Sequence, residues 1–363
     1  MRARKLKGLF VNCVEAKDSI FESGKMAFQC LFDSERYALD YVEIDEENHT
    51  ISGAYDFYLF NYHMVTMAWL DTKAIENALP GVKMTIVLEV APDDPFVYCS
   101  PDDFDAYLVL DPTLNSRRKN IYAFPRPLEA VENLAPYAPK DVPVIGSFGF
   151  ATEGKGFDHL IDAVNKEFER AVVRINIPYA SYADASRDRA KQLARMCEER
   201  AKDGIEVIVT HDFMSKRDLI EWCGQNTLNC FLYDRNMPGL AATTDQAISS
   251  GRPLIISKND TFRHIETFIK PYPQQTLKEA IENTPKQVAE IQREWSPQKF
   301  REKFETVLED FQFKEKLNVA SRAEVIILPL KKDVRPPFIQ TAKEKLAIRT
   351  RLRNLMSGNG LTR

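Results

Sequence analysis

The sequence predicts an α/β protein made of two similar halves, each with a parallel sheet covered by helices. Short apolar runs alternate with helical patterns, which is the arrangement that produces βαβ units. The alternation stops at the stretch from Pro125 to Pro143, which holds five prolines in nineteen residues, and then begins again. A chain of 363 residues is also longer than one typical core supports. We therefore expect two Rossmann-like domains and a connector between them.

The first half contains five runs that predict strands, because they are short and rich in β-branched and aromatic residues. They cover residues 6–13, 37–45, 55–62, 82–90 and 104–111. Between the first two lies SGKMAFQCLF, residues 23–32, which suits a crossover helix. Parallel neighbours need such crossovers, so we expect a helix-covered parallel sheet within a domain of residues 1–130.

The second half repeats the pattern. Strands are predicted at residues 142–150, 172–178, 204–211, 227–234 and 252–257, with helices at 156–171, 183–203, 215–225 and 243–251. Ser215 opens the third helix with Asp218 three residues later, a variant of the capping box. We expect a second domain over residues 131–313 and a cleft between the domains, because ligands of such sheets bind at the carboxyl ends of the strands.

Composition excludes several classes of protein. The apolar fraction is 44%, and no apolar run approaches the roughly 18 residues of a membrane span. Polar residues interrupt the apolar segment after the basic start, which disfavours a secretory signal and predicts a cytoplasmic protein. Six scattered cysteines without a C-x-x-C pair suggest neither a metal site nor disulfides. Neither first strand is followed by G-x-G-x-x-G, which disfavours a nicotinamide dinucleotide fold.

Charge is distributed unevenly. Residues 314–363 contain 12 Lys/Arg and 4 Asp/Glu, which gives this segment a net charge of +8. The whole chain has a net charge of −4, so the preceding 313 residues carry about −12. An acidic body argues against a nucleic-acid partner.

In residues 342–356, Ile348 and Leu352 lie on an apolar stripe among arginines, as in a helix lying on anionic lipid at the inner face of a membrane. The alternative is that this stripe docks on the acidic body or on a second subunit.

A glycine-rich turn follows the first strand of the second half, in GSFGFATEGKG. Gly146, Gly149, Gly154 and Gly156 would let backbone N–H groups approach an anion near the start of the next helix, and Lys155 would add a positive charge. The stretch is not a Walker A motif. Local spacing alone therefore leaves open an ordinary glycine turn with a solvated lysine.

A second turn of small residues lies within residues 231–257. Gly239, Ala241, Ala242 and Thr243 leave room for a ligand at a helix N-terminus, whose free amides favour phosphate. Tight packing of the helix against the sheet would explain the small side chains equally well. It does not explain why two such turns occur in one half.

These segments resemble GT-B glycosyltransferases of the family 4 type. GSFGFATEGKGFDHLIDAV is similar to the K-G segment of that family, and MPGLAATTDQAISSGRPLIIS is similar to its E-x₇-E segment with the following A-x-x-x-G-x-P-V-I. VTHDFMSKRDLIEWCGQNTLNCFLYD resembles the intervening stretch, which ends beside the nucleotide base. The resemblance covers residues 142–265. It implies the GT-B fold, with two Rossmann-like domains whose parallel sheets face each other across a cleft.

The resemblance also implies roles for residues of the second domain. Lys155 would contact the diphosphate of a nucleotide-sugar donor, and Gln246 stands where the family has the glutamate that holds the donor ribose. Pro238 replaces the first glutamate of the motif, and Arg235 or Asp234 could substitute for it. The expected donor-binding residues are Phe148, Gly149, Lys155, Phe213, Met214, Arg235, Gly239, Ala241, Ala242, Thr243 and Gln246.

Other positions depart from the family. Gly149 stands where the family has a diphosphate-binding arginine. Glu89 lies where family members commonly have a histidine facing the sugar, and His63 is a candidate replacement that could instead be structural. Ser23 and Gly24 lie roughly where the family has a glycine pair on the acceptor side. The expected catalytic residues are Lys155, Glu89 and His63.

The function implied by the resemblance is sugar transfer from a nucleotide-sugar donor to a glycan or lipid-linked acceptor, with retention of anomeric configuration, as in polysaccharide biosynthesis. No cofactor and no metal are expected, because Lys155, helix amides and a further cation would stabilise the leaving diphosphate. The departures leave two alternatives. One is a GT-B protein that binds a nucleotide or glycan without catalysis, and the other is a different GT-B enzyme such as a nucleotide-sugar epimerase.

Overall fold

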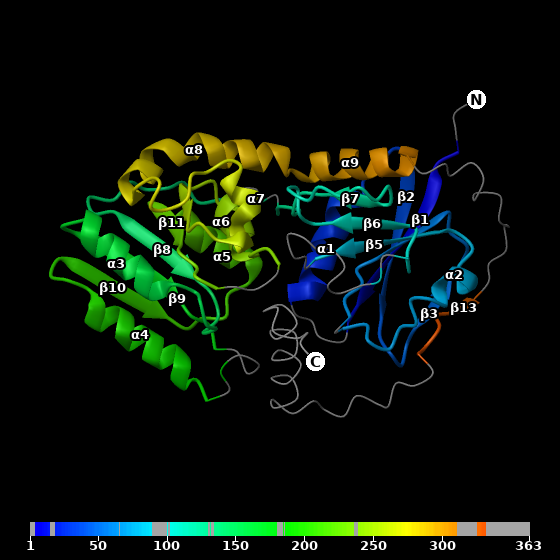
Figure 1. Ribbon diagram of the computed structural model, residues 1–363, viewed down its shortest axis with the longest axis horizontal. Coiled ribbons are helices and arrows are strands. Elements are labelled where there is room, and N and C mark those ends of the chain that lie inside the picture. The colour runs from blue at the N-terminus through cyan, green and yellow to red at the C-terminus, as the bar shows by residue number, and fades with distance from the viewer. Residues whose placement is uncertain are drawn as a thin grey trace, which may run out of the picture. The chain divides into compact units, whose positions relative to one another are not determined.

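The computed structural model describes residues 4–14, 19–64, 66–88, 100, 102–129, 131, 134–179, 184, 186–235, 239–310 and 325–331. Residues 1–329 form one compact unit, which contains two parallel sheets and the helices that cover them (Figure 1). The prediction of an α/β protein with two helix-covered parallel sheets is therefore confirmed. The basic stripe predicted at residues 342–356 lies outside the described residues.

The first sheet has six strands in the order β2-β1-β4-β5-β6-β7, and all neighbours are parallel. Its strands are β1 Leu6–Cys13, β2 Tyr37–Ile44, β4 Phe57–Phe60, β5 Val82–Val87, β6 Ala106–Val109 and β7 Ile121–Ala123. Helices α1, Ser19–Leu31, and α2, Ile75–Ala78, belong to this half, while β3, Thr50–Ser52, pairs antiparallel with β13, Val325–Ile327. The sequence predicts five of the six strands and misses β7, whose three residues are too few to form a pattern.

The second sheet has five parallel strands in the order β10-β9-β8-β11-β12. Its strands are β8 Val144–Phe148, β9 Ala171–Asn176, β10 Ile205–Thr210, β11 Leu228–Phe231 and β12 Leu254–Ile256. Its helices are α3 Phe157–Glu167, α4 Asp188–Arg200, α5 Lys216–Gly224 and α6 Thr243–Ser249, followed by η1 Asp260–Phe262 and α7 Arg263–Glu266. As predicted, the Ser215 side chain caps α5 by accepting a hydrogen bond from the backbone N–H of Asp218.

The central strands β4, β5, β6, β8 and β11 are buried along their whole length, which explains why they consist of nearly continuous apolar runs. The edge strands β2 and β10 are partly exposed. In β1, Phe10 packs in one apolar cluster whereas Leu9 and Val11 pack in another. In β8, Ile145 belongs to the cluster that includes α3, and Phe148 belongs to the cluster beside α5 and α6. Successive side chains of a strand point to opposite faces, so β1 and β8 each contribute to two clusters.

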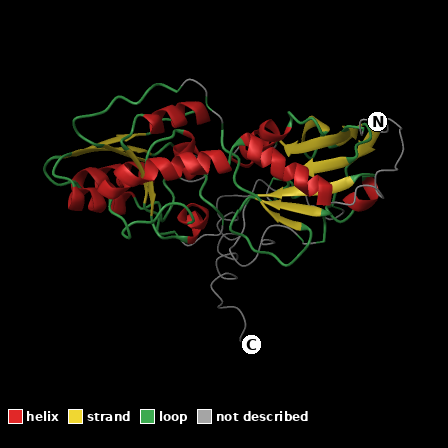
Figure 2. Cartoon of the chain, turned by 90° about the horizontal axis from the view of Figure 1, so that it is seen from above, coloured by secondary structure: helices red, strands yellow, loops and turns green. Residues whose placement is uncertain are grey.

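Two consecutive helices pack on different sheets. Helix α8, Leu277–Glu294, supplies Leu277 and Val288 to the clusters of the second half. Helix α9, Pro297–Asp310, follows it directly (Figures 1 and 2) and supplies Phe300 and Phe304 to the core of the first half. The sequence boundaries place residues up to 313 in the second domain, but the chain returns to the first core already at α9.

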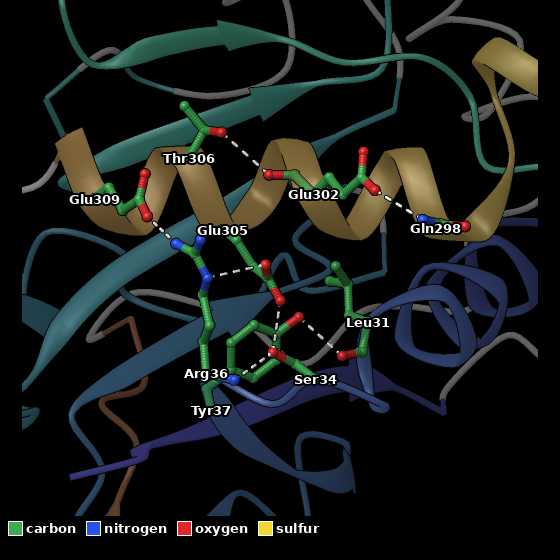
Figure 3. Close-up of polar contacts among 9 residues, drawn as sticks. All are labelled: Leu31, Ser34, Arg36, Tyr37, Gln298, Glu302, Glu305, Thr306 and Glu309. Carbon is green, nitrogen blue, oxygen red and sulfur yellow. Dashed lines mark hydrogen bonds and ion pairs between the residues drawn. The ribbon is translucent and has the colours of Figure 1, made fainter. Parts of the chain in front are cut away.

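Polar contacts add to the attachment of α9. Arg36, just before β2, pairs with Glu305 over 3.3 Å and also with Glu309 (Figure 3). The Ser34 hydroxyl donates a hydrogen bond of 2.7 Å to Glu305. Amphipathic spacing of Phe300, Phe304 and their neighbours predicts a helix, but it does not reveal which of two cores that helix will cover.

The strand orders define where ligands of this fold bind. In the second sheet, the chain passes from β8 outward to β9 and β10, and then resumes on the other side of β8 with β11 and β12. The connections after β8 and β11 therefore leave in opposite directions, and the carboxyl ends of these two neighbouring strands are the switch point at which sheets of this kind bind ligands. The glycine turn follows β8 and the small-residue turn follows β11, so both predicted turns lie at this point.

Candidate functional site

Lys155 lies at the carboxyl edge of the second sheet, in the loop between β8 and α3. Its Nζ donates a hydrogen bond of 3.1 Å to Oη of Tyr233 and lies 4.5 Å from the centroid of the same ring. Tyr233 follows β11, and its Oη is 3.0 Å from Oγ1 of Thr243, the first residue of α6. The two predicted turns thus meet through one buried tyrosine.

Close packing between the loops explains two of the glycines. Gly156 has a φ of +64°, and a Cβ there would lie 1.8 Å from the carbonyl oxygen of Leu232. Gly154 has a φ of +75°, and a Cβ there would lie 2.5 Å from Cβ of Arg235. Glycine alone tolerates both the backbone angle and the close approach. These glycines therefore hold the loop after β8 against the loop after β11.

Gly146 and Gly149 have different neighbours. Gly146 lies inside β8, where a Cβ would lie 1.9 Å from Nδ2 of the buried Asn226. Gly146 is therefore a packing position rather than part of an anion-binding turn, contrary to the sequence expectation. A Cβ at Gly149 would lie 3.2 Å from Nζ of Lys155, so the lysine side chain covers the position where the resembling family has an arginine.

Arg235 places a second cation beside Tyr233. Its guanidinium carbon lies 5.5 Å from the centroid of the Tyr233 ring, and its Nη2 donates a hydrogen bond of 2.8 Å to Oγ1 of Thr261. The same hydroxyl donates to the carbonyl oxygen of Gly239 over 2.9 Å. Nε of Arg235 is buried without a hydrogen-bond partner among the described residues. Arg235 and Lys155 therefore lie beside the same aromatic ring, that of Tyr233. Pro238, which replaces the first glutamate of the motif, lies outside the described residues.

Helix α6 separates the roles of two adjacent polar residues. Gln246 is half-buried, whereas Asp245 is buried and pairs through Oδ2 with Nε of Arg126 over 2.7 Å. Burial raises the pKa of Asp245, and the nearby charges of Arg126 and Lys216 oppose this rise. Asp245 therefore lies on a different side of α6 from Gln246, as helical spacing predicts.

Other predicted donor-side residues differ widely in exposure. Phe148 is 5% exposed and packs against Phe231 with 5.3 Å between ring centroids, so its side chain belongs to the core. Phe213, after β10, is 78% exposed, and Met214 is half-buried against the core cluster beside it. In α6 and the turn before it, Ala241 is buried and Ala242 is exposed. The carboxyl edge therefore offers Phe213, but not Phe148, as an accessible aromatic side chain.

The acceptor-side candidates of the first half lie on a helix. Ser23 and Gly24 are residues of α1, within the segment that the sequence predicts as a crossover helix. A Cβ at Gly24 would lie 2.4 Å from Nδ2 of Asn61 and 2.6 Å from Oδ1 of Asn12, so this glycine lets α1 approach two buried asparagines. His63 follows β4 and is 6% exposed. Glu89 lies outside the described residues, so the structure does not place it relative to His63.

Buried ion pairs connect elements of the two halves. Besides Arg126 and Asp245, Arg263 of α7 pairs with Asp111 over 2.7 Å, and this carboxylate is fully buried. Lys216 of α5 donates a hydrogen bond of 3.0 Å to the backbone carbonyl of Glu22 in α1. Burial lowers the pKa of Lys216, and the nearest opposing charge is that of Glu22. Sequence reasoning did not identify these residues, because single charged residues in loops carry no motif.

Sequence reasoning also missed Tyr233, which joins Lys155 to Thr243. Its only signal is an aromatic residue directly after a buried strand, a feature shared with Tyr62.

In the part of the chain that the structure describes, no three His, Cys, Asp or Glu side chains are grouped as a metal site requires. None of the described helices combines the length and apolar character of a membrane span. An open hollow beside α4 includes none of the predicted donor-side residues; it is lined by Asp184, Ser186, Asp188, Arg189, Gln192, Leu193 and Met196.

Comparison with known proteins identifies the fold. No protein-family model and no curated protein matches the sequence. Among solved structures, the chain is similar to Alr3699/HepE of Anabaena in complex with UDP and glucose, with a TM-score of 0.55 and 12% identity over 84% of this chain and 100% of that chain. It is also similar to the N-terminal domain of trehalose-6-phosphate phosphatase of Candida albicans, with a TM-score of 0.58 and 8% identity over 85% and 97% of the two chains.

A third similar structure is a glycosyltransferase of Rickettsia africae ESF-5, with a TM-score of 0.50 and 11% identity over 86% of this chain and 96% of that chain. The structural similarity over most of both chains shows that this chain has the GT-B fold, as predicted. At such identities the similarity establishes the fold, and the activity has to be argued from the residues of the site.

Proposed function

We propose that this protein is a glycosyltransferase that transfers a sugar from a nucleotide-sugar donor to a glycan or lipid-linked acceptor with retention of anomeric configuration. One observation supports this most directly. The half-buried ammonium group of Lys155 lies at the ligand-binding edge of a GT-B sheet and forms no ion pair with a described residue. Its hydrogen-bond partner is the neutral phenol of Tyr233, so the positive charge is available to a diphosphate.

Helix α3 supports the same assignment. Its first residue follows directly on the loop that carries Lys155, and its N-cap, Gly156, provides no side chain to satisfy the first amides. Free amides at a helix N-terminus favour an anionic ligand, and a lysine beside them adds a full charge. Both groups would stabilise the negative charge that develops on the leaving diphosphate.

The remaining donor contacts follow from position. Gln246, half-buried on α6, could hydrogen-bond ribose hydroxyls through both its oxygen and its nitrogen. Phe213, one of the expected donor-binding residues, presents an exposed ring after β10. The acceptor would approach from the first half, where Ser23 and Gly24 are kept as acceptor-side candidates and His63 and Glu89 as catalytic candidates.

Donor binding can be tested by a thermal-shift panel of UDP, GDP, ADP and dTDP with their sugars. A ligand at about 100 times its Kd should stabilise the folded protein by about 2.7 kcal/mol. Because the proposed site relies on Lys155 and helix amides, adding a chelator should leave the shift unchanged. No shift with any nucleotide would contradict the proposed function.

Catalysis needs a separate measurement. A nucleotide that stabilises the protein should support sugar transfer to at least one member of an acceptor array, followed by NMR of the anomeric proton of the product. Retention would appear as the same anomeric configuration in donor and product. Nucleotide binding without transfer or isomerisation of the sugar would identify a non-catalytic GT-B protein, and isomerisation without transfer would identify an epimerase.

A further inference from the structure

Two arginines of the second half form hydrogen bonds to the same residue, Asn226. Arg174 of β9 donates from Nη1 to Oδ1 of Asn226 over 3.1 Å, and Arg252 donates from Nε to the carbonyl oxygen of the same residue over 2.9 Å. Asn226 is fully buried just before β11, and Arg252 lies just before β12. A single buried asparagine therefore bonds both guanidinium groups, one through its side chain and the other through its backbone.

No described carboxylate neutralises the positive charge of these two arginines. Neither Arg174 nor Arg252 forms an ion pair with any described acidic residue, although both are half-buried. Burial lowers the pKa of both guanidinium groups, and the groups that oppose this effect are Cys223 and Tyr137 rather than carboxylates. Two like charges that share one hydrogen-bond partner and have no counterion among the described residues repel each other, and an anion bound to both would offset this repulsion.

Aromatic rings fix both guanidinium groups. Arg174 lies 4.6 Å from the centroid of the Trp222 ring, and Arg252 lies 3.4 Å from that of Tyr137. The Tyr137 hydroxyl is itself 3.0 Å from Oγ1 of Thr227, which ties the connector to β11. Stacking of this kind restricts a flexible side chain before a ligand arrives and so reduces the entropy lost on binding.

Most donor groups of the two arginines remain available. A guanidinium has five N–H donors, and only one from each arginine is bonded to Asn226. None of the nitrogens of Arg174 or Arg252 is both buried and without a partner, so the remaining donors are accessible to solvent. Paired planar guanidinium groups match the oxygens of a phosphate through parallel hydrogen bonds.

We propose that Arg174 and Arg252 form a binding site for a phosphate group, either free inorganic phosphate or the phosphoryl group of a small sugar phosphate. The site is separate from the donor site, because Lys155 and Tyr233 lie where β8 and β11 end whereas Asn226 and Arg252 lie where β11 and β12 begin. It does not rest on the proposed glycosyltransferase activity, and phosphate can be tested on the protein without any nucleotide.

The test is a titration of the full chain with inorganic phosphate at constant ionic strength, monitored by tryptophan fluorescence and by calorimetry. Phosphate should change the emission of Trp222, since Arg174 stacks on this ring. Each of R174Q and R252Q should weaken phosphate binding at least about tenfold, the range expected for hydrogen bonds to charged groups. R174K, which keeps the charge but loses the planar fork, should bind with intermediate affinity.

Two matched variants locate the site. R187Q also removes an arginine that stacks on a tyrosine, at 4.9 Å from the Tyr179 ring, and K155M removes the cation of the donor site. Both should bind phosphate within about twofold of the wild type. Loss of binding in K155M with retention in R174Q and R252Q would overturn the proposal, because phosphate would then occupy the donor site.

The source of the phosphoryl group is decided by a second titration with ribose 5-phosphate. Tighter binding than phosphate, lost in R174Q, would assign the site to sugar phosphates, and equal binding would assign it to the phosphate group alone. Absence of saturable binding of either ligand by folded wild-type protein, at up to about 10 mM, would overturn the proposal. Melting curves without ligand should be recorded to show that each variant is folded.

Discussion

The ammonium group of Lys155 has a neutral partner, the phenol of Tyr233. Its Nζ bonds the phenol of Tyr233 and covers Gly149, so its position is fixed without being neutralised. Lys166, in the same neighbourhood of the chain, is exposed at the end of α3. A fixed cation favours a ligand that gains negative charge during reaction, whereas a solvated one does not.

K155M should therefore lower the turnover number on the order of 10²-fold, with a smaller effect on donor affinity, because the charge on the leaving diphosphate increases in the transition state. Initial rates over a range of donor concentrations would separate the two effects. K166M is the matched control and should keep the wild-type rate. A K155M protein with unchanged rate and melting temperature would show that the diphosphate binds elsewhere.

Gln246 should behave differently from Lys155. Contacts to ribose hydroxyls are similar in the ground and transition states, so Q246A should raise the KM for the donor several-fold and leave the turnover number nearly unchanged. The half-buried position of Gln246 makes a large loss of stability unexpected. Steady-state kinetics with the donor varied would check this, and a fall in turnover alone would contradict a ribose-binding role.

At the scale of elements, the loop between β8 and α3 depends on glycines for packing. G156A should destabilise the protein by more than about 2 kcal/mol, because it combines an unfavourable positive φ with a clash against the Leu232 carbonyl. G224A is the matched control, since a Cβ there meets no atom within 4 Å. Urea unfolding of both variants would check the difference, and equal stability would show that the loop can rearrange.

The same elements show what the sequence could and could not predict. Periodic apolar runs identify the strands and α3 to α6, and the glycines mark the loop of Lys155, because these are local features. The role of Gly146 was misread, since its neighbour Asn226 is distant in sequence. The return of the chain at α9 and the partnership of Tyr233 with Lys155 depend on tertiary contacts, which no local pattern encodes.

At the scale of the whole molecule, membrane contact remains a prediction of residues 342–356, which lie outside the described residues. Each basic residue near an anionic surface contributes roughly 1 kcal/mol, so the full chain should sediment with anionic vesicles and less with neutral ones. Deletion of residues 332–363 should abolish the difference. Equal sedimentation of the full chain with both vesicle types would remove the membrane interpretation.

Global stability should also depend on pH through His264. This side chain is fully buried in α7, stacks on Trp295 at 5.5 Å, and makes no hydrogen bond from either ring nitrogen to a described residue. Burial lowers its pKa well below 6.5, and the charges of Arg126 and Arg263 lower it further. His264 is therefore neutral in the folded protein, whereas the unfolded chain binds a proton below about pH 6.5.

The sign of the effect follows from proton binding. Since the unfolded state binds the additional proton, this group's contribution to stability is complete above about pH 6.5 and is lost as the pH falls, by at most about 1.4 kcal/mol per pH unit.

H264F keeps an aromatic ring against Trp295 but cannot titrate, so its free energy of unfolding should fall less between about pH 7.5 and 5.5 than that of the wild type. Urea titrations at both pH values would measure these differences, and an H264F protein with the full wild-type loss would show that His264 already binds its proton in the folded state.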